Sequence, residues 1–137
     1  MKNENNTNRL TNPHDKLFRE VWSDLENVQS FLEGNLPDEI LRHMEPETLQ
    51  ICKDSFIEKE LQDYFSDMLY KVTLSGSTGY LYVLFEHKSY HDKYLHLQLL
   101  EYMTKIWRLH LKQQNANKKE KQNETLPLPI VLPLVIY

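Results

Sequence analysis

An unbroken run of apolar and aromatic residues, 79–85, stops at a short polar segment in which an acid and an amine flank a histidine. A run of this length that begins with glycine predicts a β-strand buried on both faces. Because side chains alternate along a strand, Glu86 and Lys88 should point to one side of the sheet and His87 to the other. Two charged side chains at the end of a buried strand are costly unless they have partners.

A second strand is predicted over residues 66–74, which are joined to the first run by four residues that include a glycine. Two strands with a short glycine-containing connection form a β-hairpin. We expect Leu74 to face Tyr80, and this register places Asp67 opposite residues 86–88. Facing side chains in such a pair lie about 5 Å apart at Cβ. The sequence therefore predicts that Asp67 meets the acid and the amine at one end of the hairpin.

Hydrophobic periods predict the remaining elements. They are a helix over residues 12–33, short helical turns over 37–43, a first strand over 47–53, the longest helix over 92–114 and a last strand over 129–137. Asn12 and Pro13 suit the start of a helix, and Gly34 suits its end. Pro133 indicates that the last strand lies at a sheet edge or is kinked.

Composition is that of one soluble domain. The chain has 137 residues, with 40% hydrophobic and 26% charged residues. Residues 1–11 are polar and are predicted to be disordered, which leaves a domain over 12–137. The single cysteine, Cys52, excludes an internal disulfide and is typical of a reducing compartment. The polar start is unlike a signal peptide, and the longest apolar run, about ten residues, is too short to span a bilayer. We therefore expect a cytoplasmic protein with no membrane-spanning segment.

The net charge of −4 is unevenly distributed along the chain. Residues 1–66 carry 7 basic and 14 acidic groups, whereas residues 67–137 carry 9 basic and 6 acidic ones. Most of the positive charge lies within residues 103–123, in the side chains of Lys105, Arg108, Lys112, Lys118, Lys119 and Lys121. A local basic stripe matters more for contact with phosphates than the total charge does. These six residues are therefore candidate DNA contacts, and the alternative is a solvated helix end followed by a polar loop.

The hairpin residues resemble a known nuclease pattern. Asp67 is followed, after 18 residues, by Glu-x-Lys, which is similar to the PD-(D/E)XK nuclease superfamily. The surrounding stretches Ser-Asp-Met-Leu-Tyr and Phe-Glu-His-Lys-Ser resemble the recombination-promoting nuclease/putative transposase family within it. Further matching pieces are Asn12 to Val21, Phe31-Leu32, Leu36-Pro37, Leu99 to Met103 and Leu128 to Pro133. Their order and spacing carry a resemblance that covers roughly residues 12–137.

The resemblance implies an α/β fold with a restriction-endonuclease-like αβββαβ core, in which a mixed sheet is flanked by helices. It also implies a Mg²⁺-dependent DNA endonuclease that hydrolyses phosphodiester bonds and promotes recombination or transposition, with Mn²⁺ as a substitute ion. DNA is the implied partner, and a homodimer is compatible with that role. The alternative is a catalytically inactive remnant of the transposase family that acts only as a DNA- or protein-binding module.

The resemblance also implies a role for each site residue. Asp67 and Glu86 are the implied metal ligands, with the carbonyl oxygen of His87 as a further one, because Mg²⁺ prefers hard oxygen ligands. Lys88 would orient the attacking water and stabilise the charged transition state. The implied accessory residues are Glu20 on the first helix and the pair Gln98 and Tyr102, which share one face of the longest helix.

Two features depart from the family pattern. Many members of the closer family have glutamine where this chain has Lys88, so this chain is nearer to the active superfamily pattern. The family also normally continues beyond a strand like the one that ends at Tyr137, so we expect a C-terminally truncated copy. Without the resemblance, the alternative for the hairpin residues is an ion-pair network of an aspartate, a glutamate and a lysine at a sheet edge.

Overall fold

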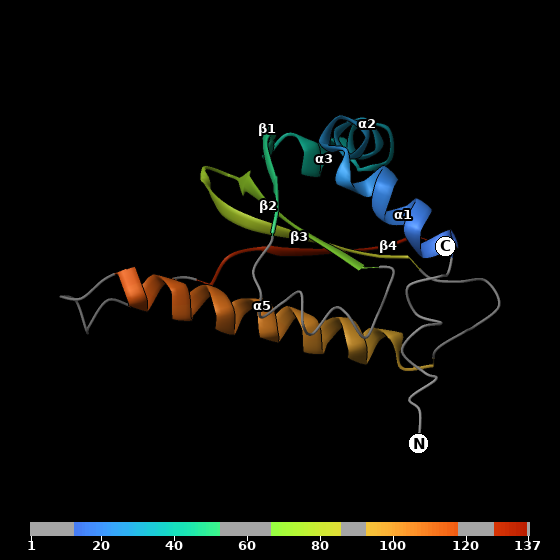
Figure 1. The fold of residues 1–137 in the computed structure, drawn as a ribbon. Coiled ribbons are helices and arrows are strands. Elements are labelled where there is room, and N and C mark those ends of the chain that lie inside the picture. The colour runs from blue at the N-terminus through green and yellow to red at the C-terminus, as the bar shows by residue number, and fades with distance from the viewer. Residues whose placement is uncertain (1–12, 53–66, 86–92, 118–127, 137) are drawn as a thin grey trace, which may run out of the picture.

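A mixed four-stranded sheet forms the centre of the molecule (Figure 1). The structure is a computed structural model and describes residues 13–52, 67–85, 93–117 and 128–136. The strands are β1 (Met44–Ile51), β2 (Asp67–Leu74), β3 (Ser77–Phe85) and β4 (Val131–Ile136), and they lie in the order β1-β2-β3-β4. The neighbours β1, β2 and β3 are antiparallel, whereas β4 runs parallel to β3.

Helices cover both faces of this sheet. The helices α1 (Pro13–Ser23), α2 (Leu25–Asn35) and α3 (Asp38–Leu41) lie on one side, and α5 (Leu95–Asn117) runs along the other (Figure 1). Parallel neighbours such as β3 and β4 need a long crossover connection, and α5 lies in that connection. The predicted α/β class, a mixed sheet flanked by helices, is confirmed, and the architecture is compatible with a restriction-endonuclease-like core.

Two apolar layers hold the sheet between the helices. The layer beneath α1 and α2 includes Val28, Leu32, Tyr70, Leu81 and Val83. The layer against α5 includes Leu69, Tyr80, Tyr82, Tyr102 and Ile106. Successive residues of β3 enter opposite layers, as strand alternation requires, and its middle residues are almost fully buried. The prediction of a strand buried on both faces is therefore confirmed.

The hairpin turn is tighter than predicted, and this changes the register. Ser75 and Gly76 form a two-residue turn in which both have positive φ, 51° and 77°, the combination that a type I′ hairpin turn requires. Leu74 consequently pairs with Ser77, and Asp67 pairs with Leu84. The predicted pairing of Leu74 with Tyr80 was wrong by three residues, because two residues counted as loop belong to β3.

The predicted first helix is two helices. Asp24 interrupts the helical run with extended backbone angles, and its side chain accepts a hydrogen bond from the backbone N–H of Glu26 over 3.0 Å. Aspartate is a favoured residue at this capping position. The apolar period continued through the break because both helices pack on the same layer of the core. The predicted disordered segment, 1–11, lies outside the described residues.

The remaining elements differ from prediction mainly at their ends. The strand β1 begins three residues earlier than predicted, at Met44, and includes Pro46. Its pairing with β2 is irregular between Glu45 and Gln50. Pro46 lies in this stretch and is tolerated there, because it has no backbone N–H to donate to a regular ladder. The helix α5 begins at Leu95 rather than at residue 92. The strand β4 lies at the sheet edge, as Pro133 indicated.

Within the parts of the chain that the structure describes, no helix combines the length and the apolar composition needed to cross a bilayer.

Candidate active site

Asp67 is a buried carboxylate at the first residue of β2, with 2% of its surface exposed. Tyr82 lies near it because it is two residues from Leu84, the partner of Asp67 across the hairpin. The hydroxyl of Tyr82 donates a hydrogen bond to Oδ2 of Asp67 over 2.5 Å. The other oxygen, Oδ1, is buried and has no hydrogen-bond partner among the described residues. Such oxygens are uncommon in native proteins, so Oδ1 marks a position where a further group would be stabilising.

Burial also changes the acidity of this carboxyl group. It raises the pKa of Asp67 from 3.8 to about 7, because the charged form loses its contacts with water. The hydrogen bond from Tyr82 and the positive charge of Arg19 lower the pKa and so limit the rise. At neutral pH the protonated and charged forms are therefore both populated, and a nearby cation would favour the charged form. Perturbed acids of this kind are concentrated at functional sites.

A column of side chains connects Asp67 to α5. The ring of Tyr82 stacks on that of Tyr102, with 5.3 Å between the ring centroids and 20° between the ring planes. The Nζ atom of Lys105 lies 5.2 Å from the centroid of the Tyr102 ring, within the range of a cation–π attraction. The column therefore runs from the buried carboxylate, through two tyrosines, to a basic residue of α5.

The helix α1 reaches the same end of the hairpin from the other side of the sheet. The ring of Phe18 packs 5.4 Å from that of Phe85, the last residue of β3. The next residue, Arg19, is exposed, and its charge acts on Asp67. Glu20, the predicted accessory acid, is also exposed on α1. The structure thus places one cation of α1 within electrostatic reach of the buried carboxylate.

The other predicted site residues are placed as follows. Glu86, His87 and Lys88, which follow β3 directly, lie outside the described residues. Gln98 is half-buried on α5, and Tyr102 is buried four residues later. The ring of Tyr102 stacks on that of Tyr82, whose hydroxyl donates to Asp67. Tyr102 is buried and therefore does not face solvent.

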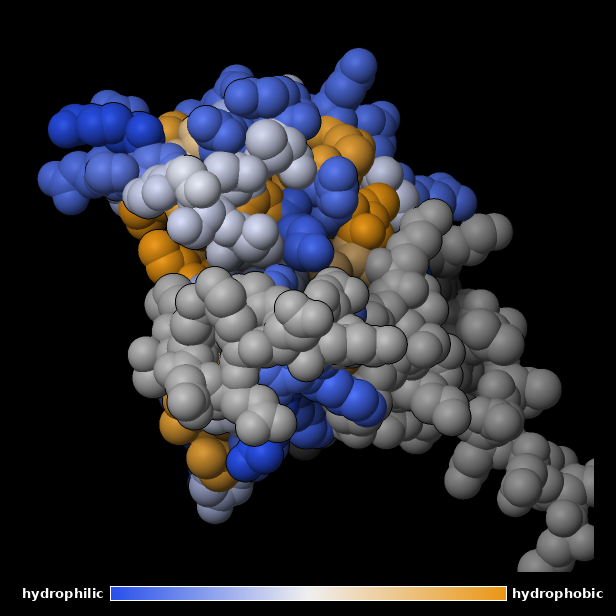
Figure 2. All heavy atoms as spheres, turned by 90° about the vertical axis from the view of Figure 1, so that its left-hand side faces the viewer, coloured by the Kyte–Doolittle hydropathy of each residue, from blue (hydrophilic) through white to orange (hydrophobic). Residues whose placement is uncertain are grey.

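Three of the six candidate DNA contacts, Lys105, Arg108 and Lys112, lie on α5. Their spacing of three and four residues puts them on one side of the helix. Arg108 and Lys112 are exposed, whereas Lys105 is half-buried. At the lower end of the face in Figure 2, at the height where Figure 1 shows α5, hydrophilic side chains lie beside a hydrophobic group. The other three candidates, Lys118, Lys119 and Lys121, lie outside the described residues.

The described residues supply part of a metal site. None of their His, Cys, Asp and Glu side chains form a group of three or more that could hold an ion. Asp67 does offer a carboxylate oxygen without a partner, and Mg²⁺ prefers this kind of ligand. Among the described residues, Asp67 can therefore supply one ligand of such an ion. The other implied ligands belong to the segment after β3, which lies outside the described residues.

Sequence reasoning missed two residues near Asp67. Tyr82 was counted only as part of an apolar strand, although a buried tyrosine hydroxyl usually needs a hydrogen-bond partner. Strand alternation puts Tyr82 on the same face as Leu84, so this signal was present once the register was known. Arg19 gave no such signal, because its relation to Asp67 depends on how α1 packs against the sheet.

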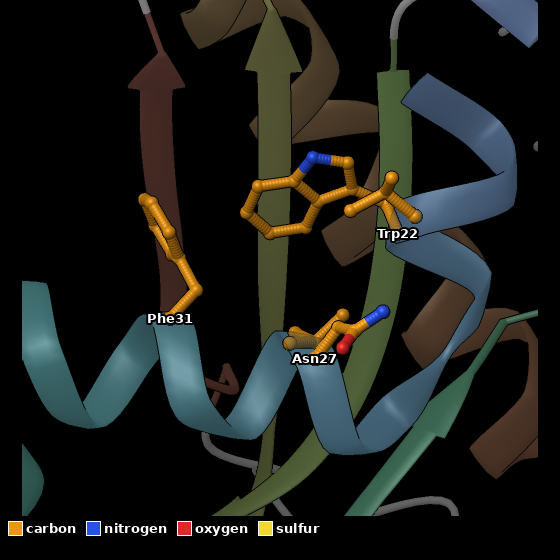
Figure 3. A pocket seen from close by; sticks show the side chains of 5 residues that line it. Trp22, Asn27 and Phe31 are labelled. Carbon is orange, nitrogen blue, oxygen red and sulfur yellow. The ribbon is translucent and has the colours of Figure 1, made fainter. Parts of the chain in front are cut away.

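A separate pocket of about 320 Å³ lies at the elbow between α1 and α2 (Figure 3). Its lining residues are Val21, Trp22, Asn27, Val28 and Phe31. Trp22 comes from α1 and Phe31 from α2, and their rings meet edge-on with 4.9 Å between centroids. None of the lining residues is a predicted site residue, and Trp22 and Val28 belong to the core. We therefore assign this pocket to helix packing.

Comparison with known proteins gives a consistent family. Residues 12–137 match the family described as "Putative transposase, YhgA-like". The chain is 32% identical over 127 residues to "Recombination-promoting nuclease RpnC" of Escherichia coli (strain K12), which covers 93% of this chain and 39% of that relative. It is 33% identical over 127 residues, with the same coverage, to "Inactive recombination-promoting nuclease-like protein RpnE" of the same organism. The chain thus spans 39% of the length of these relatives. No solved structure matches it significantly.

The family match includes every strand of the sheet and helices of both layers, and relatives above 30% identity are aligned over most of the chain. This chain belongs to the family of YhgA-like putative transposases.

Proposed function

We propose that this protein is a Mg²⁺-dependent DNA endonuclease that promotes recombination or transposition. The observation that carries the proposal is the buried carboxylate of Asp67, with one oxygen bound by Tyr82 and the other without a partner. A cation at the second oxygen would compensate the burial of the charge. Divalent ions held by carboxylates are a common means of phosphodiester hydrolysis, and the relative RpnC is named a nuclease.

In this proposal Asp67 and Glu86 hold the ion, and the backbone carbonyl of His87 is a further ligand. Leu84 and Tyr82 lie on the face of Asp67, so we expect the alternation of β3 to direct a carboxylate at position 86 to the same face. When bound, the ion supplies neutralisation of charge on the phosphate and a lower pKa for water, and Mn²⁺ would serve in its place.

The chain's own residues then act around the ion. Lys88 orients the attacking water and stabilises the negative charge that develops on the phosphate oxygens. The packing of Tyr102 keeps bulk water away from the region beside Asp67. Glu20, which is exposed on α1, is an accessory acid, and Gln98 is an accessory residue of α5.

DNA would lie along α5 in this arrangement. Arg108 and Lys112 are exposed on one side of the helix, and Lys105 lies on that side at the end of the column that leads to Asp67. Contacts from such cations to phosphates release counterions and supply affinity without sequence preference. The undescribed residues Lys118, Lys119 and Lys121 would extend the same stripe.

A second candidate function is a non-catalytic module that keeps the fold and binds DNA or protein. The observation that favours it is the similarity to the relative RpnE, which is named inactive and is as similar to this chain as the relative named a nuclease. In this second candidate the buried carboxylate of Asp67 would be a retained feature without a reaction.

Nicking of supercoiled plasmid DNA by the purified chain distinguishes the two candidates. We expect nicking in Mg²⁺ or Mn²⁺, none in a chelator, and loss of nicking in Asp67→Asn. The matched control is Asp38→Asn, which makes the same chemical change at an exposed residue of α3 and should keep full activity. DNA binding without nicking in any divalent ion would favour the binding module.

A further inference from the structure

We propose that Tyr82 is a positioning residue that holds one oxygen of the Asp67 carboxylate, so that the other oxygen alone is presented to a divalent ion. This inference rests on the proposed function, because it assumes that Asp67 is a metal ligand.

The first support is the asymmetry of the carboxylate. Oδ2 accepts the Tyr82 hydroxyl over 2.5 Å, and Oδ1 has no hydrogen-bond partner in the described residues. A hydrogen bond from a hydroxyl to a charged carboxylate is charge-assisted and directional. It therefore limits rotation of the Asp67 side chain and leaves a single oxygen for a ligand.

The second support is that the Tyr82 hydroxyl is itself fixed. Tyr82 has 0% of its surface exposed and lies on β3, a central strand of the sheet. Tyr102 of α5 stacks on its ring. Leu69 is the direct partner of Tyr82 across the hairpin, so Asp67 is a diagonal neighbour. Diagonal neighbours are about 7 Å apart, a distance that a tyrosine can reach and that a short polar side chain cannot.

The arrangement also predicts ion selectivity. Ca²⁺ is flexible in coordination and often takes both oxygens of one carboxylate, whereas Mg²⁺ demands near-ideal octahedral geometry. With Oδ2 engaged by Tyr82, Asp67 offers one oxygen and favours the smaller ions Mg²⁺ and Mn²⁺ over Ca²⁺. Removing the hydroxyl frees Oδ2 and should therefore weaken this preference.

The test is to measure metal binding by Tyr82→Phe, which removes one oxygen atom from a buried ring. The matched control is Tyr80→Phe, since Tyr80 is buried on the same face of the same strand and its hydroxyl lies 3.0 Å from Nδ1 of His110. Hydrogen-bond partners of metal-binding carboxylates typically contribute about 10- to 100-fold to metal affinity. We expect calorimetry to show a Mn²⁺ affinity at least tenfold weaker in Tyr82→Phe and within about twofold of wild type in Tyr80→Phe.

A purely structural role for Tyr82 would not change ion preference, so the ratio of Mn²⁺ to Ca²⁺ affinity is the second measurement. We expect this ratio to fall in Tyr82→Phe and to stay constant in Tyr80→Phe. The Mn²⁺ concentration for half-maximal DNA nicking should rise with the dissociation constant, while the rate at saturating Mn²⁺ stays within a few-fold of wild type. Circular dichroism and a thermal melt confirm that each variant is folded at the assay temperature.

The outcomes separate this inference from the function on which it rests. Loss of Mn²⁺ binding in Asp67→Asn together with wild-type affinity and selectivity in Tyr82→Phe would overturn the positioning role and leave the metal site standing. Unchanged Mn²⁺ binding in Asp67→Asn would overturn the metal site itself, and with it the role of Tyr82. Equal losses of affinity in Tyr82→Phe and Tyr80→Phe would show a general effect of core hydroxyls and would also overturn the inference.

Discussion

Tyr80 and His110 join the centre of the sheet to α5 through a buried contact. The tyrosine hydroxyl lies 3.0 Å from Nδ1 of the imidazole, and the rings meet edge-on at 84° with 5.7 Å between centroids. Burial lowers the pKa of His110 from 6.5, and the positive charge of Lys71 lowers it further. The imidazole is therefore neutral in the folded protein at neutral pH. The contact docks α5 against the strand that also carries Tyr82.

The lowered pKa of His110 predicts a loss of stability on acidification. As the pH falls below 6.5, the unfolded chain binds a proton at this position before the folded chain does, so the free energy of unfolding decreases. His110→Gln removes the titrating group and keeps a side chain that can hydrogen-bond Tyr80. Urea denaturation between pH 7 and pH 5 should show a smaller decrease for the variant than for wild type. Parallel curves for the two proteins would contradict the prediction.

The raised pKa of Asp67 predicts the opposite pH dependence. Between pH 3.8 and about 7 the folded chain holds a proton that the unfolded chain has lost, so ionisation of Asp67 costs stability as the pH rises. A shift of this size corresponds to at most about 4 kcal/mol above pH 7. The asparagine in Asp67→Asn is neutral at every pH. The variant should therefore be more stable than wild type at pH 8 in a chelator, and this difference in stability should be much smaller at pH 4.

A thermal melt at pH 8 and pH 4 checks this prediction. In Asp38→Asn the carboxylate lost is exposed, so its effect on the melting temperature should be small at both values. Millimolar Mg²⁺ should raise the melting temperature of wild type at pH 8 and leave that of Asp67→Asn unchanged, because the variant lacks the negative charge at residue 67 that the ion would compensate. An Asp67→Asn variant less stable than wild type at pH 8 would show that the charge is already compensated without metal.

Lys88 should act on the reaction and not on binding. Lys88→Met keeps most of the side-chain volume and removes the charge, so single-turnover nicking at saturating Mg²⁺ should slow by roughly a hundredfold, or about 3 kcal/mol. DNA and metal affinity should stay near wild type, as expected for an interaction made mainly in the transition state. Lys88→Gln should retain partial activity, because an amide can still orient water. Wild-type rates in Lys88→Met would refute the catalytic role.

The exposed cations of α5 should contribute to DNA affinity through phosphate contacts. We expect Arg108→Gln combined with Lys112→Gln to weaken binding to unrelated DNA sequences by a similar factor. The slope of log K against log salt should become shallower by at most about 2, since each lost phosphate contact counts for about 0.9. Arg42→Gln, a charge change at an exposed residue after α3, is the control and should leave the slope unchanged. If the slope of the double variant equals that of wild type, these residues do not contact phosphates and serve only solubility.

The order of elements could be predicted from hydrophobic periods, because burial on one or two faces leaves a pattern in the residues themselves. The strand β3 and the long helix α5 are clear cases, whereas the edge position of β4 was indicated by Pro133. Local backbone details were harder. The break at Asp24 does not disturb the apolar period, and the tight turn at Ser75 depends on a positive φ at a residue other than glycine.

For the site, the sequence by itself determined that Asp67 belongs to a hairpin whose second strand leads directly to Glu86 and Lys88. Only the tertiary structure decided that Asp67 is buried, that Tyr82 binds one of its oxygens and that Arg19 of α1 acts on its charge. The reason is that hairpin membership is local, whereas a carboxyl group's pKa and partners depend on everything packed around it. That environment is made by β3, α5 and α1 together, and their packing follows from the register of the sheet.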